Sequence, residues 1–271
     1  MAVPLQLEIL SQPDDTSCGP TCLHSVYRYW GHDIALAQVR REVPQLEQGG
    51  TLAVLLACHA LALGYRALIY TYNLQMFDPT WFLPGAPDLR DRLNKQLEHK
   101  RASTLHIATG AYLDYLERGG EVRFEDLTPR LLEQHLSRGV PILTGLSATF
   151  LYRCARERGT TADDVRGDPT GHFVVLYGYD HERDEVRVAD PLQPNPATAS
   201  GQFYTVPVQR LLAAILLGTL TYDANLLILE PAGRDLAVAD AAAGVPIARD
   251  PARLRRPAGP PAPRHPVPRA G

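Results

Sequence analysis

QPDDTSCGPTC occupies residues 12–22 and joins a polar turn to an amphipathic segment. Pro20 suits the first turn of a helix, where its missing N–H leaves no hydrogen bond unmade, and apolar residues then recur at helical spacing. The pattern predicts a helix over residues 19–30. Cys18 therefore stands at a helix N-terminus, where free N–H groups and the helix dipole favour a thiolate, the nucleophilic form of cysteine. Taken alone, Cys18 could also be a buried, inert thiol.

Length and composition indicate a globular protein. The 271 residues are 45% hydrophobic and 21% charged, and a net charge of -3 gives no attraction to nucleic acid or anionic membrane. The apolar run at residues 52–63 is too short to span a bilayer, and residues 1–10 lack the features of a secretory signal. Because the four cysteines form no disulfide pattern, we expect a cytoplasmic protein.

The order of predicted elements indicates an α+β fold. Helical patterns dominate the first half of the chain, and short apolar strands dominate the second. After Pro231 the composition changes to alanine, proline, glycine and arginine. We expect one domain over residues 1–231, with a helical N-terminal half packed on a mostly antiparallel sheet. Residues 232–271 are expected to form a disordered tail that is dispensable for the chemistry.

Two later residues could complete a nucleophilic site around Cys18. His172 opens a strongly apolar predicted strand, and imidazole is the usual base. Asp190 ends the next predicted strand, so the pair shares a face only if the hairpin register permits it. A loop of three or five residues centred on His181 places His172 opposite Asp190, whereas four residues would separate their faces. A plain structural histidine and a turn aspartate before Pro191 are the alternatives.

Gln12 is a candidate for the remaining catalytic group. Acyl transfer needs a hydrogen-bond donor aimed at the oxyanion that forms when the carbonyl is attacked. A side-chain amide on the turn before Cys18 could supply that donor together with the Cys18 backbone N–H. A solvated turn glutamine is the alternative.

The sequence predicts neither a metal nor a cofactor. Cys18 and Cys22 lie on one face of the predicted helix, but no second cluster supplies the four ligands of a closed zinc site. Cys22 is therefore expected to be a core contact. No phosphate-binding glycine loop of the P-loop or dinucleotide type is visible.

Several of these blocks together resemble a known family. Gln12 is followed by DTSCGP at residues 15–20, then by GHFVV at residues 171–175 with GYD closing the strand, and by ADP at residues 189–191. The set is similar to the papain-like cysteine peptidases of the C39 and C39-like group, which includes the bacteriocin-leader peptidases. The resemblance spans roughly residues 5–229.

The resemblance implies a papain-like fold in which Cys18 is the nucleophile, His172 the base, Asp190 its orienting partner and Gln12 the oxyanion donor. It implies a stand-alone form, because neither a transporter span nor an ATP-binding motif is visible. The implied activity is hydrolysis of an amide bond, either a peptide or an isopeptide bond, in a peptide or protein substrate. Acyl or peptidyl transfer by the same groups, and an inactive binding module on a peptidase fold, remain alternatives.

Long connecting segments often carry specificity. The proline-rich and aromatic segment at residues 78–87 and the polar excursion at residues 150–170 are therefore candidate walls of the cleft. Trp81, Phe82 and Tyr152 could offer apolar contacts there.

Overall fold

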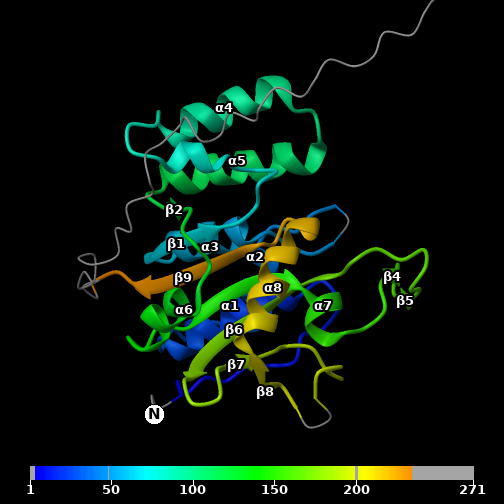
Figure 1. The fold of residues 1–271 in the computed structure, drawn as a ribbon. Coiled ribbons are helices and arrows are strands. Elements are labelled where there is room, and N and C mark those ends of the chain that lie inside the picture. Colours follow the sequence, from blue (N-terminus) through cyan, green and yellow to red (C-terminus); the bar gives the residue numbers. More distant parts are fainter. Residues whose placement is uncertain (1–3, 48, 199–200, 234–271) are drawn as a thin grey trace, which may run out of the picture. The chain divides into compact units, whose positions relative to one another are not determined.

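The computed structural model describes residues 4–47, 49–198 and 201–233 (Figure 1). Its helices and 3-10 turns are α1 Cys18–Tyr29, α2 Leu36–Glu42, α3 Ala53–Ala62, η1 Pro79–Phe82, α4 Leu89–His99, α5 Ser103–Glu117, α6 Pro129–Leu136, α7 Ala148–Tyr152, α8 Val208–Leu217 and η2 Gly218–Thr221. Its strands are β1 Tyr65–Thr71, β2 Glu121–Arg123, β3 Ile142–Ser147, β4 Glu157–Arg158, β5 Thr161–Ala162, β6 Gly171–Asp180, β7 Glu185–Ala189, β8 Phe203–Pro207 and β9 Asn225–Pro231.

One large sheet organises the described part of the chain. Its seven strands follow the order β2-β1-β9-β3-β6-β7-β8. Every neighbouring pair is antiparallel except β1 with β2. The α+β class and the mostly antiparallel sheet are thus confirmed, and the helix predicted over residues 19–30 is α1, shifted by one residue.

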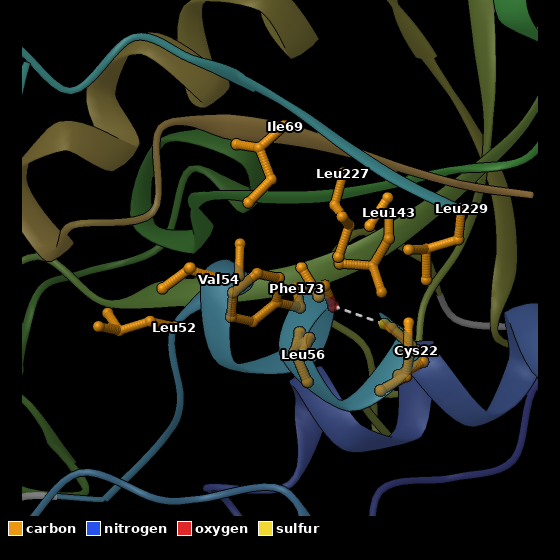
Figure 2. Packing of buried hydrophobic residues seen from close by; sticks show 14 of the residues in the cluster. Cys22, Leu52, Val54, Leu56, Ile69, Leu143, Phe173, Leu227 and Leu229 are labelled. Carbon is orange, nitrogen blue, oxygen red and sulfur yellow. Dashed lines mark hydrogen bonds between the residues drawn. The ribbon is translucent and has the colours of Figure 1, made fainter. Parts of the chain in front are cut away.

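Helices cover both faces of this sheet, which explains why its central strands are apolar on both sides (Figure 1). Successive side chains of a strand point to opposite faces. Phe173 and Val175 of β6 therefore pack with α1, α2, α3 and α5, whereas Val174 and Leu176 pack with α6, α7 and α8. Figure 2 shows Phe173 at the centre of the first cluster, among leucine side chains of β3, α3 and β9.

Helix α1 is fixed to β6 by a contact one turn beyond its N-terminus. Cys22 is fully buried, and its thiol donates a hydrogen bond to the Phe173 carbonyl over 3.2 Å. Gly19 allows a close approach at the same end, because a Cβ there would lie 2.7 Å from the Thr51 methyl carbon. Since Phe173 follows His172, these contacts place the start of α1 beside the start of β6. Cys22 is the core contact that the sequence predicts.

Strand β9 ends at Pro231, the residue at which the sequence predicts the domain to end. Apart from residues 232 and 233, the predicted tail at residues 232–271 lies outside the described residues. Across the part of the chain that the structure describes, no helix combines the length and apolar character needed to cross a membrane.

Candidate active site

The turn before Cys18 is held by the Asp14 carboxylate. This carboxylate accepts hydrogen bonds from the Thr16 backbone N–H over 3.1 Å, the Thr16 hydroxyl over 2.9 Å and the Ser17 hydroxyl over 2.6 Å. It also pairs with the Arg40 guanidinium of α2. The hydrogen bond from Ser17 is the largest of the effects that hold the pKa of Asp14 below its usual value. The backbone leading into Cys18 is thereby fixed before the helix begins.

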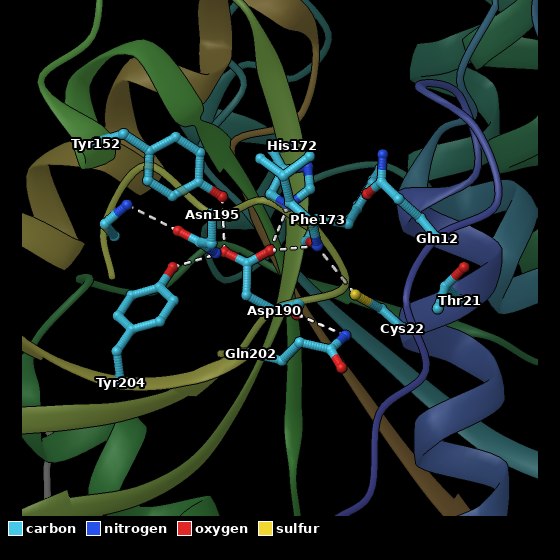
Figure 3. A network of polar contacts seen from close by, with 12 residues as sticks. Gln12, Thr21, Cys22, Tyr152, His172, Phe173, Asp190, Asn195, Gln202 and Tyr204 are labelled. Carbon is cyan, nitrogen blue, oxygen red and sulfur yellow. Dashed lines mark hydrogen bonds and ion pairs between the residues drawn. The ribbon is translucent and has the colours of Figure 1, made fainter. Parts of the chain in front are cut away.

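His172 and Asp190 form a buried pair beside Cys18. The imidazole Nε2 lies 2.8 Å from Asp190 Oδ1, and the two residues are 6% and 0% exposed (Figure 3). Nδ1 is then the ring nitrogen that remains for a further partner. The Cys18 thiol is close enough to interact with the same imidazole. The structure therefore brings together the three residues that the sequence selects, with His172 between the other two.

The second oxygen of Asp190 is held by two tyrosines, of which the sequence analysis named Tyr152 only as a possible apolar contact of the cleft and did not name Tyr204. Tyr152 at the end of α7 and Tyr204 of β8 donate their hydroxyl protons to Oδ2 over 2.6 Å and 2.7 Å (Figure 3). The Leu192 backbone N–H donates to Oδ1 over 2.9 Å. With His172, four donors surround one buried carboxylate, and this satisfies its acceptors and fixes its orientation.

These contacts set the charges of the pair. Burial favours the neutral forms of both groups, but their mutual attraction and hydrogen bonding outweigh it. The pKa of His172 is therefore raised above its ordinary value by Asp190, with a smaller contribution from Cys18. The pKa of Asp190 is lowered below its ordinary value, mainly by His172 and then by the two tyrosine hydroxyls. Near neutral pH the site thus favours an imidazolium beside an aspartate.

Gln12 lies at the same pocket but is engaged with the turn. Its backbone N–H donates to the Pro191 carbonyl over 2.8 Å, so the segment before Cys18 runs beside the segment that carries Asp190. The side-chain amide lines the pocket with Cys18 and His172. Its Nε2 donates to the Asp14 carbonyl over 3.0 Å, and its buried Oε1 has no hydrogen-bond partner. One of the two amide N–H bonds remains for another acceptor.

The pocket around these residues has a volume of about 600 Å³. Part of its wall comes from residues 150–170, as the sequence predicts, with Tyr152 and Glu157 among the lining residues. The predicted contribution of residues 78–87 is wrong, because none of them lines this pocket. Trp81 and Phe82 pack instead against the buried core around Phe77.

Within residues 4–47, 49–198 and 201–233, no group of three or more histidine, cysteine, aspartate or glutamate side chains is placed to hold a metal ion. The four cysteines are free thiols, and Cys18 and Cys22 are both buried. Cys154 lines the pocket as an exposed residue.

Comparison with models of protein families identifies one family. The sequence matches the Peptidase_C39 like family over residues 4–209. Comparison with curated proteins finds no match. A protein from Bacillus anthracis described as a C39-like peptidase is 14% identical, with 84% of this chain and 98% of that chain covered and a TM-score of 0.46.

Two further solved structures are similar. A double glycine motif protease from an AMS/PCAT transporter, in complex with a leader peptide, is 14% identical, with coverage of 84% and 94% and a TM-score of 0.40. Xylellain, a cysteine protease from Xylella fastidiosa, is 12% identical, with coverage of 83% for both chains and a TM-score of 0.36. The family match extends over more than half of the sequence. The chain therefore belongs to the C39-like family of cysteine peptidases.

Proposed function

We propose that Cys18, His172 and Asp190 form a catalytic triad that hydrolyses a peptide or isopeptide bond in a peptide or protein substrate. The observation that carries this proposal is the position of the His172 imidazole, which contacts Asp190 over 2.8 Å and also interacts with the Cys18 thiol. A nucleophile, a base and a group that orients the base are the elements that covalent acyl transfer requires.

In the proposed reaction His172 takes the proton from the Cys18 thiol before the substrate is attacked, and the resulting imidazolium, which Asp190 stabilises, faces the attacking thiolate. The sulfur then bonds to the substrate carbonyl carbon, and the carbonyl electron pair moves to oxygen. When the C–N bond breaks, the leaving amine takes the proton from the imidazolium, and a thioester remains on Cys18. Water gives a proton to His172 and attacks the thioester, which releases the acid and restores the thiol. Asp190 holds the ring in place and stabilises its charge throughout.

The test is a panel of peptides incubated with the full chain and analysed by mass spectrometry. Cleavage products would establish hydrolysis and locate the cleaved bond. An added primary amine separates hydrolysis from acyl transfer, because an amine and water compete for the same thioester. Absence of any product, together with slow alkylation of Cys18, would favour the inactive binding module instead.

Gln12 is assigned to the oxyanion. Its amide lines the pocket with Cys18, and the turn held by Asp14 fixes its distance from the nucleophile. We expect Gln12→Ala to raise the activation barrier by about 2.7–4 kcal/mol, which lowers kcat by about 10²–10³-fold, because one oxyanion donor is lost. Steady-state kinetics on a cleaved peptide measure this effect. Gln12→Glu keeps the shape but cannot donate, so it should be slow as well, and wild-type kcat in either variant would remove Gln12 from the mechanism.

The raised pKa of His172 predicts an unusual alkaline limit of activity. Burial opposes the imidazolium, but Asp190 outweighs it, so the ring keeps its proton above the usual histidine value of about 6.5. We expect the alkaline limb of kcat/KM to lie well above that pH and to move to lower pH in Asp190→Asn, which removes the carboxylate. A pH–rate profile of the free enzyme measures it. A limb that is unchanged in the variant would show that another group controls it.

We further propose that the peptidase domain ends near Pro231 and that residues 232–271 take no part in the reaction. All four proposed catalytic residues lie before β9 closes the sheet.

A further inference from the structure

Asp223 is a buried carboxyl group at the catalytic pocket that the proposed mechanism does not use. It lies between η2 and β9, is 6% exposed and lines the same pocket as Cys18 and His172. Its Oδ2 accepts a hydrogen bond from the Thr221 hydroxyl over 3.0 Å. Its Oδ1 has no hydrogen-bond partner, and none of the ion pairs among the described residues includes Asp223. A buried acceptor without a partner destabilises a fold unless a ligand supplies the donor.

The Asp223 side chain packs against two glycines, Gly145 and Gly171, which have no side chain to clash with it. A Cβ at Gly171 would lie 2.4 Å from Asp223 Oδ2, and a Cβ at Gly145 would lie 2.7 Å from Asp223 Cβ. Both distances exclude any larger residue without a shift of the neighbours. Gly171 immediately precedes His172, so the carboxyl group packs against the backbone next to the proposed base and lines the same pocket.

The charge of the pocket fits a cationic ligand. Three carboxyl groups are among its lining residues, from Asp15, Glu157 and Asp223. No lysine or arginine is among the described residues that line it. His172 is the basic side chain among these described lining residues, and it is paired with Asp190, so the other carboxyl groups can attract and orient a positively charged substrate.

The raised pKa of Asp223 agrees with a carboxyl group that lacks a positively charged partner. Burial raises its pKa to about 8, against the opposing effects of the Thr221 hydroxyl and the His172 charge. The other titratable group that interacts with it is Tyr112 of α5, whose own pKa is raised mainly by burial and then by Asp223. An ammonium or guanidinium group that reaches the carboxyl group would donate the hydrogen bond that Oδ1 lacks. Its positive charge would also favour the ionised form of Asp223.

We propose that Asp223 is a specificity-determining residue that receives the ammonium or guanidinium group of a lysine or arginine side chain near the cleaved bond of the substrate. This inference rests on the proposed peptidase function, because it assigns the substrate class of the same pocket.

The experiment uses acetylated glycine and alanine heptapeptides that carry one lysine or one norleucine at each position in turn. Norleucine matches the aliphatic length of lysine without its charge. Binding is measured to full-length Cys18→Ala and to the Cys18→Ala, Asp223→Asn double variant, so that the readout does not depend on turnover. At one position we expect lysine to bind at least about tenfold more tightly than norleucine to Cys18→Ala, because a hydrogen bond to a charged group is worth about that much. This preference should disappear in the double variant.

Glu157→Gln in the Cys18→Ala background is the matched control for general charge. It removes one negative charge from the pocket lining, so it should reduce the lysine preference by less than about threefold. Equal binding of lysine and norleucine peptides at every position overturns the proposal, and so does an Asp223→Asn variant that loses affinity equally for both. A different result is that the wild type cleaves no peptide while Cys18→Ala still prefers lysine and the Asp223→Asn double variant does not. That result would count against the proposed hydrolysis alone.

Discussion

Replacing Cys18 by alanine is expected to lower kcat/KM for any cleaved peptide by at least about 10⁴-fold, because the thiol that interacts with His172 and would form the thioester is removed. The substitution removes one sulfur atom from the start of α1, so the free energy of unfolding should change by only about 1 kcal/mol. Turnover by mass spectrometry and the thermal unfolding midpoint Tm together measure the two effects. A variant that stays folded and retains more than a tenth of the wild-type rate would contradict the proposed nucleophile.

The other cysteines provide an internal control for this prediction. Burial raises the pKa of the Cys58 thiol to about 12 and that of Cys154 above its ordinary value. Alkylation near neutral pH requires the thiolate, so both should react slowly even though Cys154 is exposed. We expect Cys18 to be labelled first in the wild type and much more slowly in His172→Ala, which removes the imidazolium. Equal labelling rates at Cys18 and Cys154 would show that His172 does not activate the thiol.

The start of α1 could be predicted from the sequence because its signals are local. Pro20 and the helical spacing of apolar residues predict a helix over residues 19–30, and in the structure this helix runs from Cys18 to Tyr29. The apolar strands are also local patterns. Their sheet order is not, because β9, the last strand, inserts between β1 and β3, and no local pattern carries that information.

The hairpin that carries His172 and Asp190 shows how a local rule can fail while its conclusion holds. Tyr179 pairs with Val186, so the loop between the strands has four residues, 181–184, and the predicted loop of three or five residues centred on His181 is wrong. Such a loop alone would place the two side chains on opposite faces. A register shift between Leu176 and Gly178 adds one residue to β6. This bulge returns His172 and Asp190 to the same face.

The groups that support the triad come from distant parts of the chain, so the sequence could not reveal them. Tyr152 and Tyr204 contact Asp190 only because α7, which precedes β7 in the chain, and β8, which follows it, both lie near the end of β7. Arg40 reaches the turn before Cys18 from α2. One of the supporting contacts could be predicted locally. Asp14 is followed two and three residues later by Thr16 and Ser17, and this pattern favours a turn that the aspartate side chain caps.

Asp190 is expected to show the second largest effect, on stability as well as on turnover. Asp190→Ala would leave His172 and the hydroxyls of Tyr152 and Tyr204 facing an empty, buried site. Removing one partner of a buried pair costs about 3–5 kcal/mol of unfolding free energy. Loss of the orienting acid should also lower kcat by about 10⁴-fold. Denaturant unfolding and kinetics at a temperature where the variant is folded measure the two effects separately.

Two milder variants separate orientation of the ring from stability of the fold. Asp190→Asn keeps one oxygen for His172 and fills the same volume, so it should recover most of the lost stability while the ring loses the charge that raises its pKa. Tyr204→Phe removes a single hydrogen bond of 2.7 Å to Oδ2 and leaves the contact with His172 in place. We expect it to cost about 1–3 kcal/mol of stability and much less activity than Asp190→Ala. If Tyr204→Phe and Asp190→Asn slow turnover as much as Asp190→Ala does, the four-donor network acts as one unit. If all three are nearly as fast as the wild type, Asp190 does not orient the base, and the triad reduces to Cys18 and His172.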